Sequence, residues 1–286
     1  MYDVGHLGHA RSAVSFDVIR RYFVYKRYSV TFVSNITDVD DKMIKRAVEE
    51  KITEEQLAER IIPEYAKDYG ALSVLPPNNQ PRATRFIPQM VALIERLLKQ
   101  EVAYITEDGV YFEVKKFKEY GKLSGQKLSE IQSGARIAVD EKKKNPEDFA
   151  LWKKAKPGEP QWEGPAGMRG RPGWHIECSA MSSTLLGETI DIHGGGIDLQ
   201  FPHHEDEIAQ SEMANGKTFA RYWLHNGHIQ VNKEKMSKSL GNFFTIKDIL
   251  KKHSAPVVRY FLLSTHYRMP IDFTDSLLEQ ARESLK

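Results

Sequence analysis

The feature that most constrains the fold of this chain is an alternation of helical and strand-like segments, which stops near residue 101 and resumes near residue 171. In residues 9–28 the apolar side chains recur at helical spacing, and the β-branched residues of 30–36 are typical of a strand. Residues 189–192 and 222–231 again look like strands, with a helical segment, 203–214, between them. Such alternation predicts an α/β fold with a parallel sheet, in which ligands bind beyond the carboxyl ends of the strands.

The interruption between residues 101 and 170 has a different character. It is rich in Lys, Gly and Pro and lacks long periodic segments, and Asp108-Gly109 lies between two short strand-like runs, 103–106 and 110–114. An Asp-Gly pair in that setting is a strong signal for a β-hairpin. We therefore expect local strand pairing here and interpret the segment as an insertion that splits the α/β domain.

Charge and composition limit the classes of function. The chain has 41 lysines and arginines against 39 aspartates and glutamates, a formal net charge of +2, so a nucleic-acid contact would have to come from local patches. There is no apolar run near the ~18 residues that cross a bilayer, and no signal-like N-terminus. We expect a cytoplasmic protein with no membrane partner.

A first candidate site is the string His6-Leu7-Gly8-His9, directly before the first predicted helix. A helix N-terminus presents N–H groups and a positive dipole end to phosphate, and Gly8 lets the backbone approach a ligand. Two imidazoles beside that end can donate hydrogen bonds to phosphate oxygens. Taken alone, the same string also fits an ordinary loop.

A second candidate site is the string Lys235-Met236-Ser237-Lys238-Ser239. Two lysines three positions apart on a loop can bring two positive charges to a polyphosphate, while the serines allow the loop to bend around it. A solvated basic loop is the alternative, and the presence of the first string disfavours it.

The lone cysteine, Cys178, and the pair His203 and Glu207 form a third candidate site. His203 and Glu207 are four residues apart at the start of a predicted helix, so their side chains share one face. Cys, His and Glu are all good zinc ligands. From the residues alone the alternatives stay open, because a lone cysteine is usually a core residue and a His/Glu pair is usually a solvated or salt-bridged helix face.

Together the first two strings resemble the two signature motifs of class I aminoacyl-tRNA synthetases. Four further stretches are similar to the cysteinyl-tRNA synthetases of that class: NITD at 35–38, GWHIECS at 173–179, DIHGGGIDL at 191–199 and FPHHEDE at 201–207. The resemblance covers essentially all 286 residues.

For the fold, the resemblance implies a Rossmann-like parallel sheet that is split by an insertion and followed by the start of a helical domain. Residues 1–100 would form the first half of a nucleotide-binding catalytic domain, 101–170 the connective insertion, 171–245 the second half and 246–286 the start of a helical stem-contact region. The family's first strand, with a fourth zinc ligand, is expected upstream of Met1. We therefore expect a fragment that also lacks most of the tRNA-binding domain.

For the chemistry, the resemblance implies a monomeric enzyme that activates L-cysteine with ATP, forms cysteinyl-adenylate and transfers the cysteine to tRNA(Cys). ATP would bind with Mg²⁺ as a substrate. One Zn²⁺ held by Cys178, His203 and Glu207 would bind the sulfur of the substrate, which separates cysteine from serine because zinc prefers a thiolate to a hydroxyl.

The resemblance also implies roles for single residues. Catalysis would rest on positioning and on groups that meet developing charge, namely His6, His9, Lys235 and Lys238. Thr37 and Trp174 would line the cysteine pocket, and spacing alone assigns no role to His193, His204 or His225. The ATP-binding residues would be His6, Gly8, His9, Asp198, Lys235 and Lys238.

Other functions fit many of the same strings. A cysteine ligase of thiol biosynthesis resembles this family, activates cysteine in the same way and transfers it to an amino sugar instead of tRNA. A non-catalytic, truncated binding module would keep the fold without the reaction. A zinc hydrolase is disfavoured, because it gives the two-lysine loop no purpose.

Overall fold

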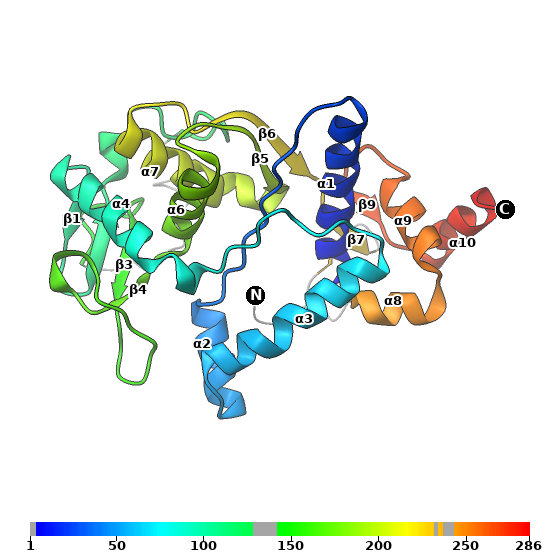
Figure 1. The fold of residues 1–286 in the computed structure, drawn as a ribbon, viewed down its shortest axis with the longest axis horizontal. Helices are drawn as coiled ribbons and strands as arrows, with labels where there is room; N and C mark the ends of the chain where they lie inside the picture. Colours follow the sequence, from blue (N-terminus) through cyan, green and yellow to red (C-terminus); the bar gives the residue numbers. More distant parts are fainter. Residues whose placement is uncertain (1–3, 128–141, 232–233, 237–242) are drawn as a thin grey trace.

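The computed structural model describes residues 4–127, 142–231, 234–236 and 243–286 (Figure 1). Its helices in this part of the chain are α1 (Leu7–Tyr25), α2 (Asp41–Glu50), α3 (Glu54–Ala71), α4 (Ile87–Lys99), α6 (Trp174–Leu186), α7 (Glu205–Asn215), α8 (Ile246–Lys252), α9 (Ala255–Leu263) and α10 (Asp275–Ser284). Its strands are β1 (Ala103–Ile105), β2 (Gly109–Phe112), β3 (Phe149–Lys154), β4 (Gly170–Pro172), β5 (Ile190–Gly196), β6 (Ala220–Asn226), β7 (Ile229–Val231), β8 (Glu234–Lys235) and β9 (Ile271–Asp272).

Local sequence explains where several helices begin. At the start of α3, the Thr53 side chain accepts a hydrogen bond from the Gln56 N–H, and the Gln56 side chain accepts one from the Thr53 N–H. This reciprocal pair satisfies two N–H groups that have no partner inside the helix. α4 buries one apolar stripe, as its periodicity predicts: Ile87, Met90, Leu93, Ile94 and Leu97.

The parallel pairing that the alternation predicts is present. β5 and β6 run parallel, from Ile190 opposite Ala220 to Gly196 opposite Asn226, and β7 pairs in parallel with β9. The stretch 222–231, predicted as one strand region, is divided into β6 and β7. The fold class inferred from the sequence, an α/β fold of parallel strands and helices, is confirmed.

One predicted strand is wrong. Residues 30–36 pair in parallel with residues 78–83 only through isolated bridges, Val33 with Asn79 and Ile36 with Arg82. The N–H groups of Ser34 and Ile36 donate to the carbonyls of Asn79 and Pro81. Pro81 has no N–H, so the ladder lacks a donor between the two bridges.

The insertion folds as an antiparallel sheet in the order β1-β2-β3-β4, and the hairpin predicted at Asp108-Gly109 joins β1 to β2. The described residues of the insertion, 101–127 and 142–170, form no core of their own. One apolar cluster runs from Phe112 and Trp152 of this sheet to Ile176 of α6 and Phe219 before β6. The sheet therefore packs against α4 and α6, and the same cluster extends to α7, on the left of Figure 1.

A second apolar cluster joins the two ends of the chain. Leu7 and Val14 of α1 pack with Ile249 of α8 and with Val258 and Leu262 of α9, on the right of Figure 1. Among the described residues, no helix is both long and apolar enough to span a bilayer. The division into four segments expected from the sequence stays a prediction.

Candidate active site

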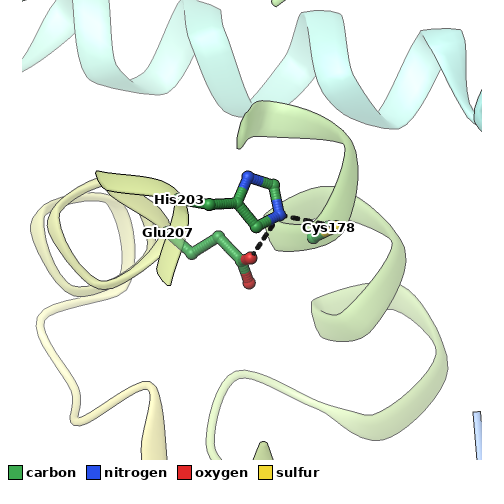
Figure 2. A group of neighbouring side chains, drawn as sticks. All are labelled: Cys178, His203 and Glu207. Carbon is green, nitrogen blue, oxygen red and sulfur yellow. Dashed lines mark hydrogen bonds and ion pairs between the residues drawn. The ribbon is translucent and has the colours of Figure 1, made fainter. Parts of the chain in front are cut away.

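Cys178, His203 and Glu207 meet where α6 packs against α7 (Figure 2). The Cys178 Sγ lies 3.6 Å from His203 Nε2, which in turn lies 2.9 Å from a carboxylate oxygen of Glu207. His203 and Glu207 are buried and Cys178 is half-buried. The structure thus brings together all three residues of the third candidate site.

The backbone around these residues explains their convergence. His203 lies in a π-helical turn, Gln200–His204, and α7 begins only at Glu205, slightly later than predicted. The i, i+4 relation still aligns His203 with Glu207. Gln210 of α7 donates to the Ser179 hydroxyl and to the carbonyl of His175, both at 3.0 Å, and these bonds lock α6 against α7.

The charges of this group fit a bound cation. Burial raises the pKa of the Cys178 thiol well above its ordinary value, and the carboxylates of Glu207 and Glu177 add to that shift. Burial also tends to raise the pKa of Glu207, but His193 and His203 outweigh it and hold that pKa well below its usual range. Each Glu207 carboxylate oxygen lies 2.9 Å from an imidazole nitrogen, one of His203 and one of His193, but neither contact has the geometry of a hydrogen bond. A buried anion, a thiol that needs a cation to ionise and an imidazole form a donor set that suits zinc.

Two further histidines, His193 and His204, lie near the same carboxylate and a third, His225, contacts His204; sequence reasoning gave these three histidines no role. His193 Nε2 lies 2.9 Å from the second Glu207 oxygen, and His204 Nδ1 lies 2.8 Å from His225 Nε2. His193, His204 and Glu207 form a second group whose atoms are within 4.8 Å of one another. Burial lowers the pKa of His204 to about 2. The signal in the sequence was that His193 and His225 lie toward the carboxyl ends of two predicted strands, and the structure shows that these strands, β5 and β6, are neighbours.

The two residues predicted to line a cysteine pocket lie beside Cys178, His203 and Glu207, the candidate metal ligands that we call the metal-ligand group. The Trp174 ring stacks on His203 with centroids 4.1 Å apart, and Trp174 is 46% exposed, so it is not a core aromatic. The Thr37 hydroxyl donates to Glu177 at 2.9 Å, one residue before Cys178. Trp174 therefore contacts His203, and Thr37 contacts Glu177, the neighbour of Cys178 in the chain.

The first string forms the start of α1. The rings of His6 and His9 stack with centroids 3.6 Å apart, and each Nδ1 accepts a hydrogen bond from the backbone N–H of the other residue. Burial lowers the pKa of His6 to about 4 and that of His9 to about 3, and Asp198 partly opposes both shifts. A Cβ at Gly8 would lie 2.9 Å from the His6 ring, so the close stacking requires glycine. The start of α1 thus lies close enough to Asp198 for its carboxylate to act on both imidazoles.

The second string is only partly described. Lys235 ends β8, opposite Gln230 of β7, and Met236 is buried, whereas Lys238 lies outside the described residues. The chain just after the string pairs with the start of α1: Leu7 N–H donates to the Phe244 carbonyl and Ile246 N–H to the Gly5 carbonyl. The backbone downstream of the second string is therefore tied to the first.

The chain is similar in sequence to known proteins along nearly its whole length. The family model described as tRNA synthetases class I (C) catalytic domain matches residues 1–283. Cysteine–tRNA ligase of Carboxydothermus hydrogenoformans is 58% identical over 285 residues, which cover 100% of this chain and 61% of that protein. The corresponding ligase of Pyrococcus horikoshii is 57% identical over 282 residues, which cover 99% of this chain and 59% of that protein. The chain thus spans about three fifths of the length of these curated relatives.

Solved structures are similar at the level of the fold. A methionyl-tRNA synthetase of Mycobacterium tuberculosis in complex with methionyl-adenylate matches with a TM-score of 0.76 over 98% of this chain and 65% of that one. The two sequences are 16% identical. This likeness shows a shared fold.

Proposed function

Because this chain belongs to the family of class I (C) tRNA synthetase catalytic domains, we propose that it activates L-cysteine with ATP and transfers it to tRNA(Cys). The observation that carries the proposal is the meeting of Cys178, His203 and Glu207 beside an exposed tryptophan. Relatives that are 55–58% identical to this chain are named cysteine–tRNA ligase.

The metal-ligand group accounts for the choice of amino acid. Cys178 Sγ, His203 Nε2 and the Glu207 carboxylate would hold Zn²⁺, which, when bound, supplies a soft Lewis acid that prefers a thiolate to a hydroxyl. Trp174 would form a wall of the pocket next to His203, and Thr37 would line it on the side of Glu177. A site that requires one specific polar group in its substrate rejects an analogue without that group by ~10⁴-fold or more. Discrimination between cysteine and serine therefore requires no editing step.

The first string and its surroundings account for the use of ATP, which would bind as its Mg²⁺ complex. With Nδ1 occupied as an acceptor, His6 and His9 each keep the proton on Nε2, where it can be donated to a phosphate oxygen. Asp198 would bind the ribose hydroxyls. Lys235 and Lys238 would meet the negative charge that develops as the cysteine carboxylate attacks the α-phosphate and pyrophosphate leaves.

The remaining expectations are part of this proposal. The proposed protein is a monomer in the cytoplasm with tRNA(Cys), L-cysteine and ATP as partners, and the relatives' name, cysteine–tRNA ligase, supports cysteine and tRNA as substrates. A cysteine ligase that uses an amino sugar would share the activation step, so the transfer step has to be measured separately.

The test is cysteine-dependent exchange of labelled pyrophosphate into ATP, with serine as the control substrate, followed by charging of tRNA(Cys). We expect exchange with cysteine and not with serine, and a loss of about 100-fold or more in Cys178→Ala, because that change removes a metal ligand. Ser183→Ala, on the same helix, is the matched control and should behave as the parent. Equal exchange with serine, or full activity of Cys178→Ala, would refute the assignment of the pocket.

A further inference from the structure

Four polar side chains from different parts of the fold form a continuous line that ends at the candidate metal ligands. The Tyr120 hydroxyl of the insertion donates to Asp206 Oδ1, while Asp206 Oδ2 lies 3.2 Å from His175 Nε2. His175 Nδ1 lies 2.8 Å from His203 Nδ1. We call Tyr120, Asp206, His175 and His203 the relay. Tyr120, Asp206 and His203 are buried and the His175 side chain is only 14% exposed, so water competes little for these contacts.

Only one arrangement of protons along the relay lets His203 act as a ligand. His203 Nε2 faces Cys178 and Glu207, so this nitrogen must keep its lone pair and the proton must lie on Nδ1. That proton is donated to His175 Nδ1, which places the His175 proton on Nε2, facing Asp206. The opposite arrangement would put a proton on His203 Nε2 and remove the ligand atom. With Tyr120 donating to the same carboxylate, each contact has one donor and one acceptor.

We propose that Asp206, held by Tyr120, is a positioning residue that fixes the orientation and the tautomer of His203 through His175. The inference rests on the function proposed above, because it assumes that His203 binds a metal. Carboxylates behind a metal-binding histidine commonly have this effect, and their loss costs about 10–100-fold in metal affinity. Here the carboxylate acts through a second imidazole.

The segment that carries Tyr120 is itself anchored to the same turn and helix as His203. The Glu205 carboxylate accepts hydrogen bonds from the N–H groups of Leu123, at 3.2 Å, and Ser124, at 2.9 Å. Gln200 donates to the Leu123 carbonyl at 3.0 Å. Tyr120 is therefore held at a defined distance from Asp206, and the insertion becomes part of the support of the metal site.

The test compares two relay variants with a matched control. The Asp206 carboxylate now faces two donors, the Tyr120 hydroxyl and His175 Nε2. Asp206→Asn turns an amide N–H, itself a donor, toward one of them, and Tyr120→Phe removes only a hydroxyl. The control is Tyr104→Phe, since the Tyr104 hydroxyl also donates to a buried aspartate of the insertion, Asp148, at 2.8 Å, but lies outside the relay. Zinc affinity is measured by competition with a chromogenic chelator. The absorption bands of the Co²⁺-substituted protein report the ligand geometry.

We expect zinc affinity to fall about 10–100-fold in Asp206→Asn and several-fold in Tyr120→Phe, with altered Co²⁺ bands, and to stay unchanged in Tyr104→Phe. If Asp206→Asn fails to fold, Tyr120→Phe decides. Unchanged affinity and bands in the relay variants, or an equal loss in Tyr104→Phe, would overturn the inference. Absence of zinc binding by the parent chain would refute the metal site and the relay together, whereas parental binding with unaffected variants would refute the relay alone.

Discussion

His6 and His9 are held as neutral imidazoles at the start of α1. Burial lowers their pKa values to about 4 and about 3, and their Nδ1 atoms are engaged by backbone N–H groups. Tyr65 of α3 also places its hydroxyl 3.3 Å from His9 Nδ1. A neutral imidazole can donate a hydrogen bond to phosphate without carrying a charge, so under our proposal the positive charge at the polyphosphate comes from the lysines of the second string.

These two histidines make stability depend on pH. In the unfolded chain they take up protons near pH 6.5, whereas in the folded chain they resist protonation until about pH 4 and about pH 3. Their contribution is therefore fully present above pH 6.5 and is lost as the pH falls toward the folded values, by up to about 1.4 kcal/mol per pH unit and residue. We expect urea unfolding to show this decline below pH 6.5. A decline just as steep in His9→Gln would contradict the assignment to this pair.

At the scale of elements, α1 is fixed to distant parts of the chain by buried charges. Asp17, 3% exposed, accepts hydrogen bonds from Leu75 N–H, Arg21 and Arg259 of α9, each at 2.9 Å. Burial tends to raise the pKa of Asp17, but these hydrogen bonds hold it below its usual value. Arg11, fully buried, donates to carbonyls of the turn after α9. These contacts of Asp17 and Arg11 fix the direction of α1 and, with it, the position of the two histidines at its N-terminal end.

Replacement of Asp17 should therefore loosen the packing of α1 on α9. We expect Asp17→Ala to lower the free energy of unfolding by about 2–4 kcal/mol, because two arginines each lose a charged acceptor and the Leu75 N–H loses the carboxylate that accepts from it. Asp275→Ala, at an exposed position in the first turn of α10, should change it by less than about 1 kcal/mol. Chemical denaturation of the two variants measures the difference, and similar losses would contradict a special role for Asp17.

For the whole molecule, two apolar clusters carry different parts of the candidate site. The cluster shared by the insertion, α4, α6 and α7 supports the metal-ligand group, and the cluster shared by α1 and α8–α10 supports the first string. Asp198 follows β5 and acts electrostatically on both His6 and His9. The proposed ATP and cysteine sites thus depend on how these two parts of the molecule meet.

Metal binding should stabilise the molecule as a whole. A ligand that binds only the folded state adds about 2.7 kcal/mol at a free concentration 100 times its Kd. We expect added zinc to raise the Tm and a chelator to lower it, and we expect Cys178→Ser to lose most of this response. Calorimetry with Ser183→Ala as the control measures it. A Tm that zinc and chelator leave unchanged in the parent would count against the metal site.

The sequence by itself determined the hairpin, the helical periodicity and the alignment of His203 with Glu207, whereas Cys178 reaches them only through the packing of α6 on α7. The start of α3 follows from its capping box, the buried face of α4 follows from its periodicity, and the turn at Asp108-Gly109 is a property of two residues. His203 and Glu207 align because they are four residues apart on successive helical turns. These features depend on neighbours in the chain, and such neighbours can be read from one sequence. The roles of the site residues stay predictions.

Only the tertiary structure decided the features that depend on partners far away in the sequence. Residues 30–36 fail to form a strand because Pro81 lies opposite them, and His193 and His225 converge because β5 and β6 are adjacent. The relay joins Tyr120 to His203 across 83 residues, an interval in which the sequence carries no pairing signal. Contacts of this kind arise from packing of the whole chain, and no local pattern encodes them.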